Sequence, residues 1–368
     1  MIRRNNSISV LLILILILHG TNVKSFTLPS PLQKVLILAE GFIAKQKVNK
    51  NLDPNIRTKF KVESDETFAA QRSNDGATTT TTTFSHALWD SALKKHATYV
   101  GDIDGITTTL VDYVGMSKDP DVLRYTQALA TVDLEQLGSA NANANNSANE
   151  LLALYINAYN CFCIGHVTKY YLADPKRRLP STITAVTKTM TDYKKTDIWD
   201  VPAGKIGRRT VTLNEIEHTI LRSCWDDPRI HAAIVCASAS CPNLRSEAFV
   251  GAKLNAQLDD QAQNWVSDTK KGLRYNPNNS QQLLVSRIFL WFQDDFQSNY
   301  GGPLAWAQQY ASTRGGKEND NDNDPKQQQQ QQQQLAAWSK LSTDDYEKNV
   351  EYFPYNWKLN DRRWERQD

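Results

Sequence analysis

The sequence predicts a helix-rich α+β domain with a central buried helix and a small sheet, and three observations support this prediction. Most of the chain after Phe84 shows apolar residues at helical spacing. One segment, beginning at Ser147, is apolar nearly all round, which is typical of an interior helix. Two short apolar runs, Ile230–Val235 and Leu283–Ile288, indicate a buried strand and a second strand or helix entry. Helices with a few non-consecutive strands favour the α+β class.

Two of the expected helices carry capping signals at their N-termini. Ser147 and Glu150 form a capping box that predicts the start of the central helix, which continues towards Tyr171. Thr212 and Glu215 form a second capping box, followed by an apolar stripe at helical spacing. Further helices are expected at residues 89–98, 122–137, 247–266 and 290–296.

Residues 1–25 are expected to be a signal peptide. Two arginines precede an apolar run from Ile8 to Leu18, and Val23 and Ser25 place small residues before a cleavage site. The run is shorter than the roughly 20 apolar residues that span a bilayer, so cleavage is favoured over a signal anchor. We therefore expect a protein of the secretory pathway that is secreted. The basic segment after the cleavage site is also typical of a bipartite plastid address, which is the alternative localisation.

The remainder of the chain divides into a leader and one domain. Residues 26–83 form a basic low-complexity leader, and residues 84–368 form a single domain, although the length of 368 residues alone permits two. A glutamine-rich insert at residues 313–334 is expected to be disordered, because its composition cannot bury apolar surface. Segments that look folded stand on both sides of it, so it is an insertion in one domain and not a boundary between two.

Composition argues against several classes of function. A net charge of +2 shows no excess of basic residues of the kind that attracts nucleic acid or an anionic membrane. The sequence contains no phosphate-binding loop and no dinucleotide fingerprint. We expect no cofactor, no nucleic-acid partner and no stable membrane span after signal cleavage. The expected partner is an unidentified small-molecule or peptide substrate.

The cysteines indicate neither a complete set of disulfides nor a metal site. The five cysteines are Cys161, Cys163, Cys224, Cys236 and Cys241. In an oxidising compartment an odd number leaves at least one thiol free or paired between chains. No C-x-x-C pair occurs, and Cys161 and Cys163 point in different directions on a helix, so no metal ligands are expected.

Six blocks of the sequence, taken in order, resemble the family catalogued as domain of unknown function 547. The blocks are Tyr155–Asn160, Leu213–His218 with Arg222, Asp227–His231, Cys236–Leu244, Trp291 with Asp295 and Phe296, and Pro354–Asn360. The resemblance extends from about Val111 to Asn360. Two positions depart from the usual family pattern, since Tyr155 stands in place of Trp and Asn356 in place of Asp. The resemblance implies no settled activity, because the family itself is of unknown function.

Cys241 is the leading candidate for a catalytic nucleophile. It lies in a loop of Ala and Ser after the predicted strand, where a thiol can be exposed and have a pKa below the ordinary value of about 8.5. His231, at the start of that strand, is the candidate base. The alternatives are a disulfide between Cys241 and Cys236, a buried structural thiol, and a His231 that only binds backbone.

Four further polar positions, Asn157, Asn160, Glu217 and Arg229, are candidates for supporting or binding roles. Glu217 lies on the apolar stripe of its helix, so its carboxylate must be paired or have a raised pKa. The candidate partners are Arg222, Arg229 and Arg245. A structural ion pair competes here with a catalytic acid or a substrate clamp. Asn157 and Asn160 lie one turn apart on the central helix, and we expect their amides to bind the loop that contains Cys241.

The leading functional hypothesis is a thiol-dependent hydrolase or acyl/amide transferase with Cys241 as nucleophile and His231 as base. This set of residues is similar in part to the papain and transglutaminase arrangement, in which the nucleophile starts the central helix. The alternative is a non-catalytic binding or assembly module of the secretory pathway or an endomembrane-derived organelle. A redox protein using Cys236 and Cys241 is disfavoured, because their spacing lacks the usual C-x-x-C turn.

Overall fold

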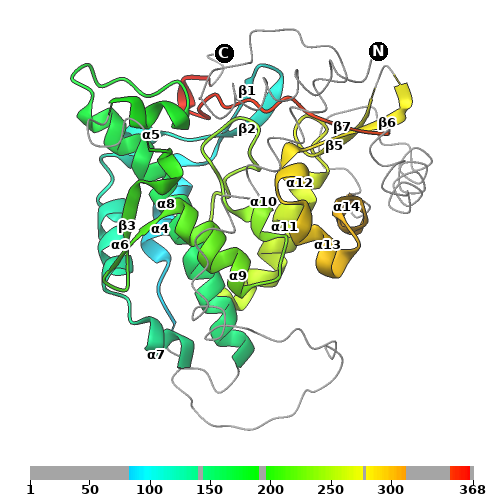
Figure 1. Ribbon diagram of the computed structural model, residues 1–368. Helices are drawn as coiled ribbons and strands as arrows, with labels where there is room; N and C mark the ends of the chain where they lie inside the picture. The colour runs from blue at the N-terminus through cyan, green and yellow to red at the C-terminus, as the bar shows by residue number, and fades with distance from the viewer. Residues whose placement is uncertain (1–82, 140–143, 190–195, 277–278, 312–348, 365–368) are drawn as a thin grey trace, which may run out of the picture.

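The computed structural model describes residues 83–139, 144–189, 196–276, 279–311 and 349–364. The expected signal peptide, the leader up to residue 82 and the glutamine-rich insert lie outside the described residues. Within the described ranges the chain is a helix-rich α+β structure with a long buried helix at its centre and small sheets, as the sequence predicts (Figure 1).

Helices make up most of the described chain. The α-helices are α4 (Ala87–His96), α5 (Tyr113–Met116), α6 (Pro120–Thr131), α7 (Leu134–Ser139), α8 (Ala144–Ala173), α9 (Arg222–Cys224), α10 (Ile230–Ala233), α11 (Leu254–Val266), α12 (Arg287–Trp291), α13 (Gln293–Tyr300) and α14 (Pro303–Ala311). The 3₁₀ segments are η2 (Ile183–Thr189), η4 (Ile198–Asp200), η6 (Gly251–Lys253) and η7 (Arg362–Trp364). The segment η5 (Glu215–Leu221) is a π-helix, a conformation found often at functional sites.

The strands form small separate sheets. They are β1 (Tyr99–Ile103), β2 (Ile106–Leu110), β3 (Pro202–Ile206), β4 (Arg209–Thr212), β5 (Leu273–Asn276), β6 (Asn279–Val285) and β7 (Val350–Tyr352). The pairs β1–β2 and β3–β4 are antiparallel hairpins. In the third sheet β6 pairs antiparallel with β5 and parallel with β7, so the chain after the insert returns to the sheet that it left (Figure 1).

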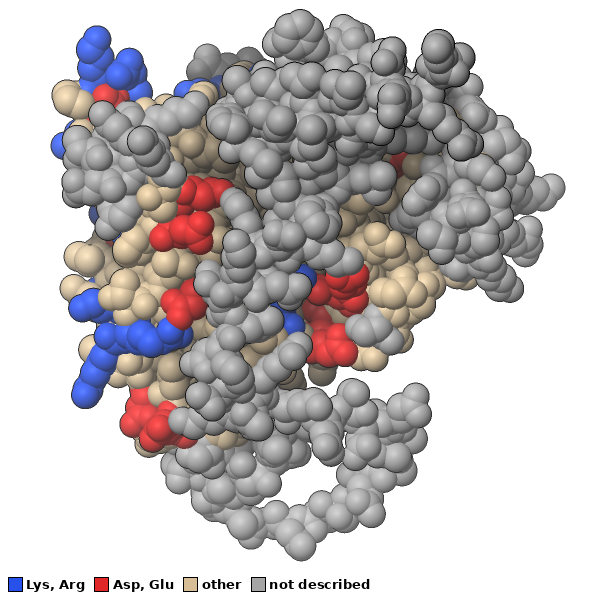
Figure 2. Space-filling view, viewed as in Figure 1, with Lys and Arg blue, Asp and Glu red and all other residues tan. Residues whose placement is uncertain are grey.

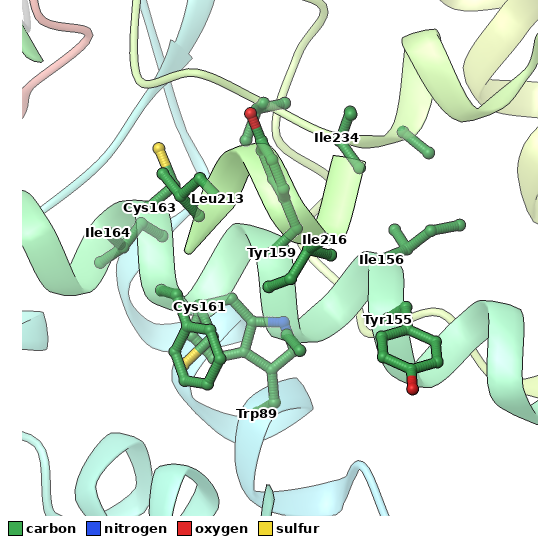
Figure 3. Close-up of a cluster of buried hydrophobic side chains, with 14 of the residues drawn as sticks. Trp89, Tyr155, Ile156, Tyr159, Cys161, Cys163, Ile164, Leu213, Ile216 and Ile234 are labelled. Atoms are coloured by element: carbon green, nitrogen blue, oxygen red, sulfur yellow. The ribbon is translucent and has the colours of Figure 1, made fainter. Parts of the chain in front are cut away.

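Helix α8 is the centre of the larger of two hydrophobic cores. Its stretch Ser147–Ala173 is long and apolar enough to cross a membrane, but 94% of the apolar window is buried inside the protein, as in a core helix. Figure 3 shows Trp89 of α4 on one side of α8 and Leu213 and Ile216 near the start of η5 on the other. The smaller core lies among α11 to α14 and the third sheet.

Several expected helices have different boundaries. The expected helix 122–137 divides at Val132, whose extended backbone separates α6 from α7. The expected helix 247–266 starts later, with η6 and then α11. Helix α8 starts at Ala144, so Ser147 is not its N-cap, and the buried Ser147 Oγ has no hydrogen-bond partner in the described part of the chain. The second capping signal is confirmed in part, because Glu215 N–H donates to Thr212 Oγ1 at 3.1 Å.

The predicted strand Ile230–Val235 is wrong, because its first residues form the short helix α10. Asp227 Oδ1 accepts from Arg229 N–H at 3.0 Å, and Pro228 follows Asp227 directly. An Asp side chain that accepts a nearby backbone N–H, followed by Pro, is typical of a turn that leads into a helix. The chain leaves the helix at Ile234, whose backbone is extended, and continues into Cys236. His231 is therefore held on a helix and not at the mouth of a strand.

Candidate functional site

The loop formed by residues 236–241 is held in place by the C-terminal segment 355–360. Three backbone hydrogen bonds connect them: Ala239 N–H to Lys358 O (2.9 Å), Ser240 N–H to Asn356 O (3.2 Å) and Asn360 N–H to Ala237 O (3.3 Å). Ala237 has a φ of 58°, in the left-handed region that residues with a Cβ rarely adopt. The two segments are far apart in sequence, yet they fix one loop conformation between them.

This conformation brings two free thiols together. The Sγ atoms of Cys236 and Cys241 lie 2.9 Å apart, and Cys236 N–H donates to Cys241 Sγ at 3.0 Å. We call Cys236 and Cys241 the thiol pair. Two hydroxyl groups complete the surroundings of Cys236 Sγ, with Ser238 Oγ at 3.0 Å and Tyr355 Oη at 3.1 Å.

The two cysteines differ in both exposure and thiol pKa. Burial raises the pKa of Cys236, but the hydrogen bonds from Cys241, Ser238 and Tyr355 outweigh burial and lower that pKa below its ordinary value. Burial and then the neighbouring Cys236 raise the pKa of Cys241 well above its ordinary value. Cys236 as a whole residue is half-buried, whereas Cys241 is only 5% exposed. The pair therefore favours a thiolate at Cys236.

The expectation of an exposed Cys241 with a lowered pKa is wrong. A loop of small residues leaves room for close approach, but here the C-terminal segment fills that room. From the sequence, Cys236 is expected only as a disulfide or redox partner of Cys241. The signal that distinguishes the two thiols is Tyr355, in the last family-like block, whose contact with Cys236 joins residues 119 positions apart.

His231 is bound to a carboxylate that sequence reasoning did not single out. His231 Nε2 lies 2.7 Å from Asp295 Oδ2, and Arg222 binds both oxygens of Asp295, with Nε–Oδ2 at 2.5 Å and Nη2–Oδ1 at 2.8 Å. Arg222 Nη1 also donates to His218 Nδ1 at 2.7 Å. We call His218, Arg222, His231 and Asp295 the histidine cluster. In the described part of the chain no hydrogen bond connects His231 to either thiol of the pair.

Phe292 provides an apolar surface for the histidine cluster. Its ring stacks on His231 with centroids 4.2 Å apart and planes 24° apart, and the Arg222 guanidinium lies 4.8 Å from its centroid. Burial opposes the charged form of Asp295, but hydrogen bonds from His231 and Arg222 outweigh it and hold the pKa of Asp295 well below its ordinary value. Burial lowers the pKa of His218.

Glu217 interacts electrostatically with both the histidine cluster and the thiol pair. Its Oε2 accepts from Tyr159 Oη of helix α8 at 3.0 Å, so the expected arginine partner is replaced by a phenol. The negative charge of Glu217 acts on a residue of each group, because it raises the pKa of His218 and opposes ionisation of Cys236. The expected arginine partners bind other carboxylates: Arg222 binds Asp295, Arg229 binds Asp227 and Asp259, and Arg245 binds Glu247 and Asp260.

Residues 236–241, which we call the thiol loop, are flanked by segments that two amides of helix α8 hold in position. Asn160 Nδ2 donates to Ala233 O at 2.9 Å, and its Oδ1 accepts from Val235 N–H at 2.8 Å. Asn157 makes the corresponding pair of bonds to the backbone of Phe249, at 2.7 and 3.0 Å. Both side chains are buried. They therefore bind the chain just before and just after the loop, and not the loop residues themselves.

An aromatic group and a buried amine flank the thiol pair. The ring of Tyr355 packs against Trp291 and Trp357, with centroids 4.8 and 4.5 Å away. Lys271 is 2% exposed, and its Nζ donates to Asn243 Oδ1 at 2.7 Å and to Thr108 Oγ1 at 3.0 Å. Burial lowers the pKa of Lys271 to about 8, although the charges of Asp268 and the thiol pair act in the opposite direction.

Charged side chains elsewhere in the described part of the chain are dispersed. Among the described residues, no group of three or more His, Cys, Asp or Glu side chains is placed to hold a metal ion. On the described part of the face in Figure 2, acidic and basic side chains lie among one another and do not gather into one continuous patch.

A comparison with protein families finds one match. The family model described as "Protein of unknown function, DUF547" matches residues 143–266. Nothing matches among the curated proteins or the solved structures. The matched range contains both thiols, His231, Glu217 and the two amides of α8, whereas Asp295 and Tyr355 lie beyond its end. The site thus combines the matched segment with residues contributed by the rest of the domain.

Proposed function

The chain carries a DUF547 domain over residues 143–266, and from this premise we propose that the domain is a thiol-dependent hydrolase or acyl/amide transferase with Cys236 as its nucleophile. The observation that carries the proposal is the environment of Cys236 Sγ. This sulfur has three hydrogen-bond partners within 3.1 Å, and Cys236 as a whole residue is only half-buried. A lowered pKa increases the fraction of thiolate, which is the form that attacks a carbonyl carbon.

The first half of the reaction begins at the Cys236 thiolate, which the hydrogen bonds to Cys236 Sγ favour. The thiolate attacks the carbonyl carbon of an acyl donor, a sulfur–carbon bond forms, and the bond to the leaving group breaks with its electron pair. Ser238 and Tyr355, which contact the sulfur, stabilise the thiolate before attack. The product of this half-reaction is a thioester on Cys236.

The second half of the reaction needs a group that takes a proton from water or from an acceptor amine. We assign this role to His231, because an imidazole oriented by a buried carboxylate is the usual arrangement of a general base. Support for the assignment is the 2.7 Å bond to Asp295, which Arg222 holds in turn. Glu217, whose charge acts on both His218 and Cys236, is the alternative proton acceptor.

An activated ester tests the proposal without knowledge of the natural substrate. The reduced full chain mixed with p-nitrophenyl acetate should release a burst of nitrophenolate and gain one acetyl group on the peptide that contains Cys236. Cys236→Ser should remove the burst, and Cys224→Ser, which changes a buried thiol outside the site, should leave it unchanged. His231→Gln retains an amide donor for Asp295 and should let the acetyl-enzyme accumulate.

Two results would contradict the proposal. One is acetylation that is confined to lysines or to other cysteines. The other is a burst of equal size in Cys236→Ser and in the unsubstituted protein. Either result would favour the non-catalytic binding or assembly module, in which the same residues serve only to pack the thiol loop against the C-terminal segment.

A further inference from the structure

We propose that Cys236 and Cys241 also react as a dithiol with low-molecular-weight disulfides, closing into an intramolecular disulfide that withdraws the nucleophile reversibly. The two sulfur atoms are 2.9 Å apart in their free form. A disulfide bond is about 2.05 Å long, so closure requires an approach of less than about 1 Å. The loop already holds the two thiols in contact.

The two thiols have different roles in this reaction. Cys236 is half-buried and has the lowered pKa, so it is the thiol that meets an incoming disulfide. Cys241 is 5% exposed and is therefore shielded from the incoming molecule, but it touches Cys236 directly. Cys241 is the resolving thiol.

The chemistry balances with a small disulfide as the oxidant. The Cys236 thiolate attacks one sulfur of the small disulfide, which forms a mixed disulfide and releases one small thiolate. Cys241 then attacks Cys236 Sγ, the bond to the small molecule breaks, and a second small thiolate leaves and takes up the proton of Cys241. In total, two protein thiols are oxidised and one disulfide is reduced to two thiols.

The other cysteines do not compete for the mixed disulfide. Cys161 and Cys163 are fully buried within helix α8, and burial raises the pKa of both. Burial also raises the pKa of Cys224, to about 11, and no hydrogen bond in the described part of the chain connects Cys224 to the thiol pair. The assignment of the resolving role to Cys241 follows from this geometry.

The proposal is tested on the reduced full chain with oxidised glutathione, followed by trapping with N-ethylmaleimide and peptide mass spectrometry. The unsubstituted protein should lose two hydrogens and yield a peptide in which Cys236 and Cys241 are joined. Cys241→Ser should instead retain glutathione on Cys236, with at least roughly tenfold more mixed disulfide than the unsubstituted protein. Cys224→Ser is the matched control and should behave as the unsubstituted protein does. Glutathione that persists on Cys236 in the unsubstituted protein, or a disulfide to Cys163, would overturn the proposal.

The proposal that the disulfide withdraws the nucleophile rests on the proposed function. The disulfide and the acyl transfer can nevertheless be tested separately. Acetylation of Cys236 by p-nitrophenyl acetate should stop on oxidation and return with dithiothreitol. If the disulfide forms but the reduced protein is never acetylated, the acyl-transfer function fails and the dithiol reaction stands. If the reduced protein is acetylated but no disulfide forms, the dithiol reaction fails and the acyl-transfer function stands.

Discussion

The imidazole of buried His231 and the carboxylate of half-buried Asp295, 64 positions apart in the sequence, are joined by a 2.7 Å hydrogen bond. Arg222 binds the same carboxylate through two nitrogens, so one aspartate orients both a buried cation and a histidine. Asp295 comes from helix α13 and His231 from helix α10. The bond therefore ties the smaller core to the larger one at the candidate site.

We expect Asp295→Asn to lower the free energy of unfolding by about 3 kcal/mol at neutral pH, because Arg222, 11% exposed, is left without an anionic partner. Urea denaturation measures this. Asp294→Asn, an exposed neighbour on the same helix, is the matched control and should change stability by less than about 1 kcal/mol. Equal effects of the two substitutions would contradict the assigned role of Asp295.

The same aspartate should contribute a stability that is lost in acid. The folded-state pKa of Asp295 lies below its ordinary value of 3.8, so its contribution is complete above pH 3.8 and is lost as pH falls towards the folded pKa. Between about pH 4 and pH 2 the unsubstituted protein should therefore lose more stability than Asp295→Asn. Unfolding followed by circular dichroism at both pH values measures the difference, and parallel loss in the two proteins would contradict it.

Asn160 and Asn157 allow a matched pair of substitutions. Each amide satisfies one backbone N–H and one carbonyl in the interior, so Asn160→Ala and Asn157→Ala should each cost about 2–4 kcal/mol. Only Asn160 binds the segment that enters the thiol loop, so only Asn160→Ala should raise the alkylation rate of Cys241, by several-fold. Iodoacetamide labelling read by peptide mass spectrometry separates the two. A similar rate increase in both variants would show that lost stability alone exposes the thiol.

The sequence predicted the class of fold and the central helix, because both depend on the spacing of apolar residues along one segment. It predicted that Asn157 and Asn160 have buried partners, because a buried amide needs one, but both bind backbone outside residues 236–241. It did not identify Cys236 as the more accessible thiol, since that depends on Tyr355 and the C-terminal segment, 119 positions away. It missed Asp295 as the partner of His231 for the same reason, because no local pattern reports a pairing between two helices.

Tyr355→Phe should raise the pKa of Cys236, because it removes a phenol that donates to the thiolate while keeping the ring that packs against Trp291 and Trp357. A hydrogen bond to a charged group is worth about 1.5 kcal/mol, which corresponds to a shift of about one pH unit. The pH profile of Cys236 alkylation measures the shift. Tyr310→Phe removes a phenol that binds Asp259 instead and should leave the profile unchanged.

Lys271 should make the protein more stable in alkaline solution. Its folded-state pKa is about 8 against an ordinary value of 10.5, so between these values the unfolded chain binds the proton more tightly and stability rises with pH. The contribution is complete above pH 10.5 and is lost as pH falls through about 8. Relative to Lys271→Met, the unsubstituted protein should therefore gain up to about 3 kcal/mol over this window.

Urea denaturation at about pH 7.5 and about pH 10 on both proteins measures this gain, because the other groups that titrate in the window are common to the two and cancel in the difference. Lys270→Met, which removes the exposed neighbouring amine, is the matched control and should retain the pH dependence of the unsubstituted protein. If Lys271→Met instead keeps the full pH dependence, the amine titrates normally in the folded state. The burial of Lys271 between Thr108 and Asn243 would then carry no electrostatic cost.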